Sequence, residues 1–154
     1  MLVDPPNDQI VERQVNDAIK GGMALPRWGW PVPRSYNGAT GKERIAGWQK
    51  VLIAERLGLL PPRGCCSLCA VTVAEQRHTE LYFRPITSMP VCRSCHFAIH
   101  RRFNDPRRWQ AFLAQRNCAS SWANALRTIE LGREDALRIS AARDVFSALA
   151  SEVG

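Results

Sequence analysis

Apolar and polar residues follow helical spacing in two stretches of the N-terminal part of the chain. Residues 7–20 predict a short amphipathic helix, which Gly21 ends. Residues 40–60 predict a second helix, which begins at Thr40 as a cap and ends at two consecutive prolines. Each helix has one apolar face, so each must pack against another part of the protein.

The C-terminal part of the chain shows the same spacing in further runs. Asp105 can cap the helix that follows it, and Pro106 suits the first helical position. Gly132 separates the last two runs. The expected helices cover residues 93–103, 107–117, 122–131 and 133–150.

Two short runs with strand-forming residues stand between these helical regions. Residues 71–73 (VTV) and 80–83 (ELYF) are separated by the polar residues 75–79, and they predict a β-hairpin. The stretch 23–41 contains several prolines, glycines and tryptophans. It predicts an ordered loop without a regular element.

The composition is typical of a soluble globular protein and argues against a membrane protein. Hydrophobic residues make up 45% of the chain and charged residues 23%. No apolar run approaches the roughly 18 residues that a membrane span needs. The N-terminal residues are acidic and no apolar signal segment follows them, so we expect a cytoplasmic protein.

The net charge of +7 is concentrated in two blocks. Residues 22–50 carry +4 and residues 92–118 carry +5. Of the 21 basic residues 18 are arginine, whose planar guanidinium suits phosphate oxygens. GC-rich coding would also favour arginine, but it does not explain the clustering. The two blocks therefore indicate nucleic acid as a partner, with DNA expected.

Four of the six cysteines form two Cys-x-x-Cys pairs. Cys66 and Cys69 are separated from Cys92 and Cys95 by 22 residues. Cytosolic thiols stay reduced, and two such pairs brought together make the tetrahedral Cys₄ site that structural zinc prefers. We therefore predict a structural Zn²⁺ bound by these four residues. Cys65 is adjacent to Cys66, but the spacing to Cys69 favours Cys66 as the ligand.

The three histidines of the chain are not needed for a Cys₄ site. His96 and His100 lie four residues apart, so on a helix their rings share one side, as two ligands of one metal would. His78 lies between the two cysteine pairs and can face that helix. Two other interpretations stay open: His96 replaces a cysteine as zinc ligand, or the histidine pair has no metal role.

The order of these motifs resembles that of the HNH, or ββα-metal, nucleases. That family has a Cys-x-x-Cys pair, a strand ending in a histidine, a loop, and then Cys-x-x-Cys-His-x-x-x-His. CSLC at 66–69, RHTELYF at 77–83 and CRSCHFAIH at 92–100 stand in this order, within about a quarter of the chain. The chain also looks like a group of uncharacterised bacterial proteins with an HxEDY-like segment, here HTELY at 78–82.

The resemblance implies a role for each histidine. His78 would be the general base that activates water, while His96 and His100 would help to hold a second divalent ion (Mg²⁺, Mn²⁺, Ni²⁺ or Zn²⁺) at the scissile phosphate. Before His78, where many family members have an aspartate or histidine, this chain has Arg77, and it lacks the central asparagine of the family. Glu80, on the same strand face as His78, would supply the carboxylate. The arginines that would position the nucleic-acid backbone are Arg93, Arg101, Arg102, Arg107 and Arg108.

Periodicity and motifs together predict an α+β, mostly helical chain. Residues 1–64 would contribute N-terminal helices and the aromatic and basic loop. Residues 65–104 would form a small ββα-metal module of HNH or treble-clef type, held by the Cys₄ zinc site, because so small a module buries little core of its own. Residues 105–154 would add C-terminal helices, and we expect one compact unit.

Three functions are compatible with these residues. The first is a metal-dependent HNH-type endonuclease, a hydrolase acting on DNA phosphodiester bonds. The second is a non-catalytic zinc-finger protein that binds DNA or RNA through the same basic face. The third is a zinc-stabilised protein-interaction module. Because a purely structural module has no need to place all its histidines around one site, the sequence favours the nuclease.

Overall fold

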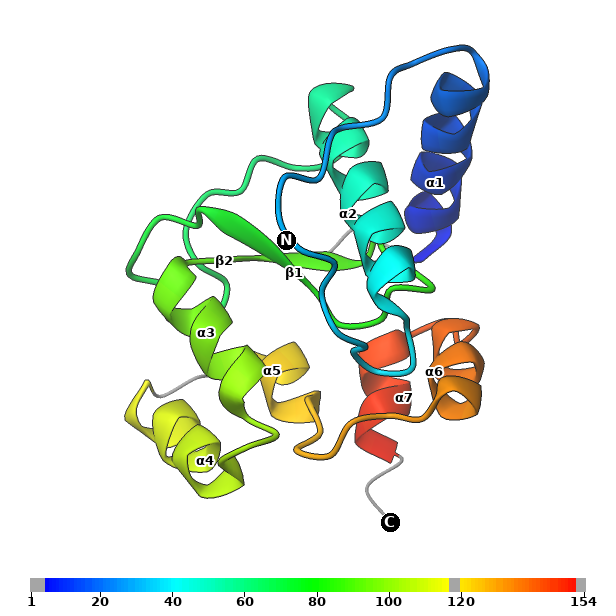
Figure 1. The fold of residues 1–154 in the computed structure, drawn as a ribbon. Coiled ribbons are helices and arrows are strands. Elements are labelled where there is room, and N and C mark those ends of the chain that lie inside the picture. Colours follow the sequence, from blue (N-terminus) through cyan, green and yellow to red (C-terminus); the bar gives the residue numbers. More distant parts are fainter. Residues whose placement is uncertain (1–4, 117–119, 152–154) are drawn as a thin grey trace. The chain divides into compact units, whose positions relative to one another are not determined.

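A computed structural model describes residues 5–116 and 120–151 of the chain (Figure 1). Within these residues the chain forms seven helices and one two-stranded sheet. This confirms a mostly helical chain with a small sheet. None of the helices in the described ranges has both the length and the apolar character needed to cross a membrane.

The described residues group into two compact units, and the chain passes between them several times. The first unit comprises residues 5–62, 79–88 and 131–140, and the second comprises residues 63–78, 89–116, 120–130 and 141–151. Each unit therefore combines segments that are distant in the sequence.

The core of the first unit lies between its two long helices, α1 (Pro5–Lys20) and α2 (Gly41–Arg56). Its buried side chains are aliphatic, as the predicted apolar faces require. Their contacts exclude water from one face of each helix. They are Val11, Val15, Val51, Ile53, Ala54, Leu60 and Ile86.

Local chemistry sets the two ends of α2. Thr40 and Glu43 form a capping box, in which the backbone N–H of Glu43 donates to the Thr40 hydroxyl and the backbone N–H of Thr40 donates to the Glu43 carboxylate. The helix ends at Arg56, earlier than the predicted Leu60. Gly58 has φ +68°, a left-handed conformation that glycine adopts without strain, so the helix ends before the prolines.

The sheet consists of β1 (Gln76–Thr79) and β2 (Ser88–Val91), and the predicted strand positions were wrong. Val71 and Val73 are 85% and 68% exposed and lie in a loop, and residues 80–83 form a turn. All four residues of β2 are buried, and this burial outweighs the weak strand preference of the SMPV sequence.

Helix α3 (Arg93–Arg101) follows β2 almost directly and lies within the helix predicted over residues 93–103. Helix α4 (Pro106–Gln115) has Asp105 as its N-cap, and the Asp105 carboxylate accepts a hydrogen bond from the backbone N–H of Arg108. The cap expected from the Asp-Pro pair is therefore present.

The last two predicted helices differ from those observed. The helix expected over 122–131 is limited to α5 (Ser121–Ala125), after which Leu126 adopts an extended backbone. The helix expected over 133–150 is divided into α6 (Arg133–Ser140) and α7 (Val145–Ser151). The Asp144 carboxylate accepts from two backbone N–H groups at the start of α7, so a new cap interrupts the run.

Candidate metal centres

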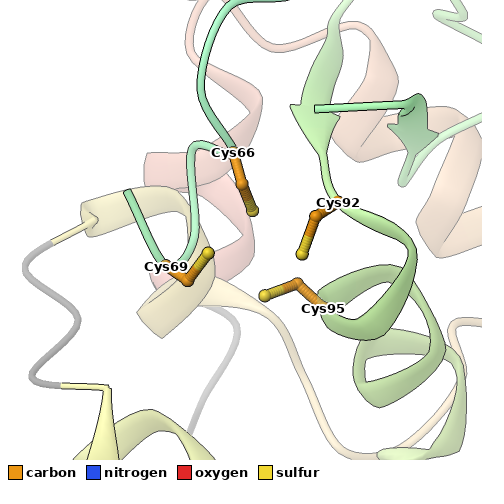
Figure 2. Close-up of side chains that lie close together, drawn as sticks. All are labelled: Cys66, Cys69, Cys92 and Cys95. Carbon is orange, nitrogen blue, oxygen red and sulfur yellow. The ribbon is translucent and has the colours of Figure 1, made fainter. Parts of the chain in front are cut away.

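The four cysteines predicted to bind zinc gather at one place in the second unit. Cys66 and Cys69 lie in the loop before β1, Cys92 is the N-cap of α3 and Cys95 lies in its first turn. Their Sγ atoms all lie within 4.8 Å of one another, and Figure 2 shows the four side chains directed toward a common centre. These four residues could therefore hold a metal ion such as zinc.

Hydrogen bonds shape the loop of the first cysteine pair and hold it against the strand that leads to the second pair. The N–H of Cys66 donates to the carbonyl oxygen of Thr72 over 2.7 Å. Both the N–H and the hydroxyl of Ser67 donate to the carbonyl oxygen of Pro90, at 2.9 and 2.6 Å. Because Pro90 lies in β2, these bonds bring Cys66 close to Cys92.

Burial and crowding oppose ionisation of two of these thiols, Cys92 and Cys95, without a cation. Burial raises the pKa of the Cys95 thiol and of the Cys92 thiol, and the neighbouring sulfur of Cys66 raises both further. Burial also acts on Cys69, but hydrogen bonds from the backbone at 71–72 outweigh it and lower the pKa of that thiol to about 6. A divalent cation compensates several thiolates at once, so this set of donors fits Zn²⁺.

The three histidines form a second cluster in the same unit. His78 comes from β1, while His96 and His100 come from successive turns of α3. One ring nitrogen of each lies within 4.8 Å of the others, and the Nε2 atoms of His96 and His100 are 3.0 Å apart. The ring centroid of His78 is 5.3 Å from each of the other two. The cluster could hold a metal ion, because imidazole is a common ligand of transition metals.

Gln76 orients one of these rings, and sequence reasoning missed it. Nδ1 of His96 donates to the side-chain oxygen of Gln76 over 2.7 Å. An amide oxygen only accepts, so this bond puts the His96 proton on Nδ1 and leaves the Nε2 lone pair for a metal. Gln76 lies two residues before His78 and so on the same face of β1. That spacing is the signal that could have identified it.

Arg77, the residue before His78, does not have to repel a cation bound at the histidine cluster. Arg77 and His78 are consecutive residues of β1, and consecutive side chains of a strand point to opposite faces of the sheet. His78 is 1% exposed, whereas Arg77 is only partly buried. The positive charge at 77 therefore belongs to the other face of the strand.

The predicted carboxylate, Glu80, has a different set of contacts. It is buried in the first unit, where its two carboxylate oxygens accept hydrogen bonds from the Tyr36 hydroxyl (2.9 Å) and the Asn37 side-chain amide (2.8 Å). Asn37 also accepts from the backbone N–H of Leu131 over 3.1 Å. Among the described residues, Glu80 belongs to neither cluster of potential metal ligands. It links distant segments of its own unit.

The five predicted phosphate-binding arginines divide into two groups. Arg102 is 1% exposed, and its guanidinium donates to the carbonyl oxygens of Arg127 (2.6 Å) and Ile99 (3.0 Å). Because the Arg102 guanidinium is buried against these carbonyl oxygens, it stabilises the backbone of the second unit and is not placed to bind a phosphate from solvent. The other four are exposed: Arg93, Arg101, Arg107 and Arg108.

Comparisons of this chain with protein-family models, curated proteins and solved structures give no match. The two clusters therefore carry the functional argument by their own chemistry.

Proposed function

We propose that this chain is a metal-dependent endonuclease of the HNH type, which hydrolyses phosphodiester bonds in DNA. The main support is the histidine cluster, in which a strand residue, His78, meets His96 and His100 on one helix. The same helix carries Cys92 as its cap and Cys95 in its first turn. This arrangement is the one that the HNH resemblance implies.

The cysteine cluster would hold a structural Zn²⁺. Four thiolate ligands fill a tetrahedral zinc site and leave no position for water or substrate, so such a site supports folding and not hydrolysis. It would fix the loop at 66–69 to the start of α3. The orientation of His96 and His100 would then depend on this zinc.

The histidine cluster would carry the chemistry. His96 and His100 would hold a divalent ion through Nε2, with Gln76 orienting the ring of His96. When bound, such an ion supplies Lewis-acid stabilisation of the charge that develops on the scissile phosphate and the leaving oxygen. His78 would accept a proton from the attacking water, and the exposed arginines would bind flanking phosphates.

Metal-dependent cleavage of plasmid DNA tests this function. Zinc-loaded protein is incubated with supercoiled plasmid and added Mg²⁺, Mn²⁺ or Ni²⁺, and nicked and linear products are measured. His100→Ala is expected to require more added metal or to lose activity, because it removes one ligand. Gln110→Ala changes an exposed residue of α4 and serves as the control, with unchanged cleavage.

Two results would exclude the nuclease. One is a folded, zinc-loaded protein that cuts neither DNA nor RNA with any of these metals. The other is a His100→Ala variant that cuts like the wild type at every metal concentration. Salt-sensitive binding to nucleic acid without cleavage would favour the non-catalytic zinc-finger protein.

A further inference from the structure

A hollow of about 830 Å³ lies along α3 and α4 in the second unit. Its volume falls within the range of about 300–1,000 Å³ that is usual for ligand pockets. Arginines dominate its charge, since five line it against two acidic residues, Glu75 and Asp105. Four of the five arginines are exposed: Arg93, Arg101, Arg108 and Arg116.

Carboxylates within residues 5–116 and 120–151 do not neutralise these exposed arginines. In the described ranges of the chain, none of the four forms a salt bridge with a carboxylate. The Asp105 carboxylate instead accepts a backbone hydrogen bond as the cap of α4. The hollow therefore keeps a positive charge that an anionic ligand would compensate.

An aromatic ring stands among these charges. Phe97 is 51% exposed, although its ring would be expected in a core. The guanidinium carbons of Arg93 and Arg101 each lie 5.7 Å from its ring centroid. The three residues follow at intervals of four along α3 and so form one stripe on its surface. A second pair also lines the hollow, with the guanidinium carbon of Arg116 4.6 Å from the ring centroid of Phe112.

We propose that this hollow binds an unpaired nucleotide of single-stranded nucleic acid, with its base stacked on Phe97 and its phosphates on the surrounding arginines. An unpaired nucleotide offers both a flat aromatic face and an adjacent anion, which the stripe matches. A duplex offers phosphates but keeps its base faces stacked inside. The acidic side chains of a peptide offer carboxylates, but their anionic group carries no ring that would stack on Phe97.

The stripe lies beside the candidate catalytic cluster on the same helix. With about 100° between successive residues, the side of α3 that carries Phe97 is about 80° around the axis from the side that carries His96 and His100. A strand held in the hollow could continue to the histidines. This inference rests on the proposed function, because it takes nucleic acid as the substrate. It adds that the substrate has an unpaired segment next to the scissile bond.

Fluorescence anisotropy of the zinc-loaded full chain, without added divalent metal, tests the proposal. The probe is a labelled single strand of about 12 nucleotides, compared with the same sequence as a duplex. Phe97→Ala is expected to weaken single-strand binding about 5- to 150-fold, the effect of losing one stacked base. Phe97→Trp keeps a stacking surface and should bind like the wild type.

A matched pair of arginine variants tests the phosphate contacts in the hollow. Arg101→Ala should weaken single-strand binding and reduce its dependence on salt between about 50 and 200 mM, because one phosphate contact is lost. Arg107→Ala also removes one exposed arginine, but Arg107 does not line the hollow, and it should have a smaller effect. Equal zinc content and circular dichroism spectra show that all variants are folded.

The proposal is overturned if Phe97→Ala binds the single strand like the wild type, or if the duplex binds more tightly than the single strand. Cleavage assays separate this result from the proposed function. Binding that depends on Phe97 without any cleavage would retain this inference and exclude the nuclease. Cleavage together with binding that does not depend on Phe97 would exclude this inference and retain the nuclease.

Discussion

The carboxylate of Glu43 makes two stabilising interactions in the first unit. Its carboxylate accepts from the backbone N–H of Thr40 (2.8 Å) and from the Arg133 guanidinium at 2.9 and 2.7 Å. The hydrogen bonds from Arg133, followed by the bond from Thr40, lower the pKa of Glu43 to about 2. One residue therefore completes a helix cap and links the start of α2 to the start of α6.

Glu43→Gln is expected to lower the free energy of unfolding by about 1 kcal/mol at neutral pH, because the ion pair with Arg133 is lost while the glutamine oxygen still completes the cap. The folded-state pKa lies below the unfolded value of 4.5, so the contribution of the ionised group is complete above that value and is lost as the pH falls toward 2. Urea unfolding of both proteins over this range measures the difference.

The control for this variant is Asp135→Asn, which disrupts an exposed pair with Arg138. It should cost no more than about 0.5 kcal/mol, as is usual for exposed ion pairs. A Glu43→Gln variant whose deficit stays the same down to pH 2 would contradict the role assigned to the ionised carboxylate.

At the residue scale, sequence spacing was sufficient to predict interactions between residues that are close along the chain. The two Cys-x-x-Cys pairs and the Thr40 cap could be predicted, because each follows from local spacing. The contacts of Glu80 with Tyr36 and of Arg102 with the Arg127 carbonyl could not, since 44 and 25 residues separate these partners. Only the fold brings them together.

At the scale of elements, helices were predicted better than strands. The apolar period of α1, α3 and α4 is strong, and Gly21 and Asp105 mark an end of α1 and of α4. The strands are four residues long, and β2 contains a proline, so propensity did not reveal them. Burial in the fold decided which short runs became strands.

The turn at residues 36–39 gives a prediction at this scale. Gly38 has φ +78°, and a Cβ at this position would lie 2.6 Å from the Arg133 Cα. Gly38→Ala is therefore expected to cost about 2–4 kcal/mol, combining left-handed strain with a backbone clash. Thermal or urea unfolding measures this loss.

Gly22→Ala is the matched control, since Gly22 has φ +100° but no atom within 4 Å of the added Cβ. It should cost only the strain, about 1–2 kcal/mol. Equal losses for the two variants would argue against the close approach at Gly38.

At the scale of the whole molecule, the chain interleaves two units that differ in what stabilises them. The first has an aliphatic core between α1 and α2. The second brings together the cysteine cluster and short helices. The sequence predicted a helical protein with a small metal module, but local periodicity could not show that residues 79–88 and 131–140 join the N-terminal helices.

Removal of metal is expected to affect the two units unequally. A strong chelator should raise amide hydrogen exchange across residues 63–78 and 89–116, because structural zinc contributes directly to folding free energy. Helices α1 and α2 should stay protected by their own core. Cys66→Ser should reproduce the effect, while Cys65→Ser, at an exposed residue outside the cluster, should not. Unchanged protection in metal-free protein would contradict a structural zinc.

We propose that the histidine cluster hydrolyses phosphodiester bonds, and a variant of His78 tests this role most directly. The measurement is the cleavage rate of labelled DNA at saturating Mn²⁺ for wild type and His78→Ala of equal zinc content. We expect the wild type to cleave DNA and the variant to cleave it about 10²- to 10⁴-fold more slowly, the usual effect of losing a general base. Equal rates for the two proteins, or a wild type that never cuts, would contradict it.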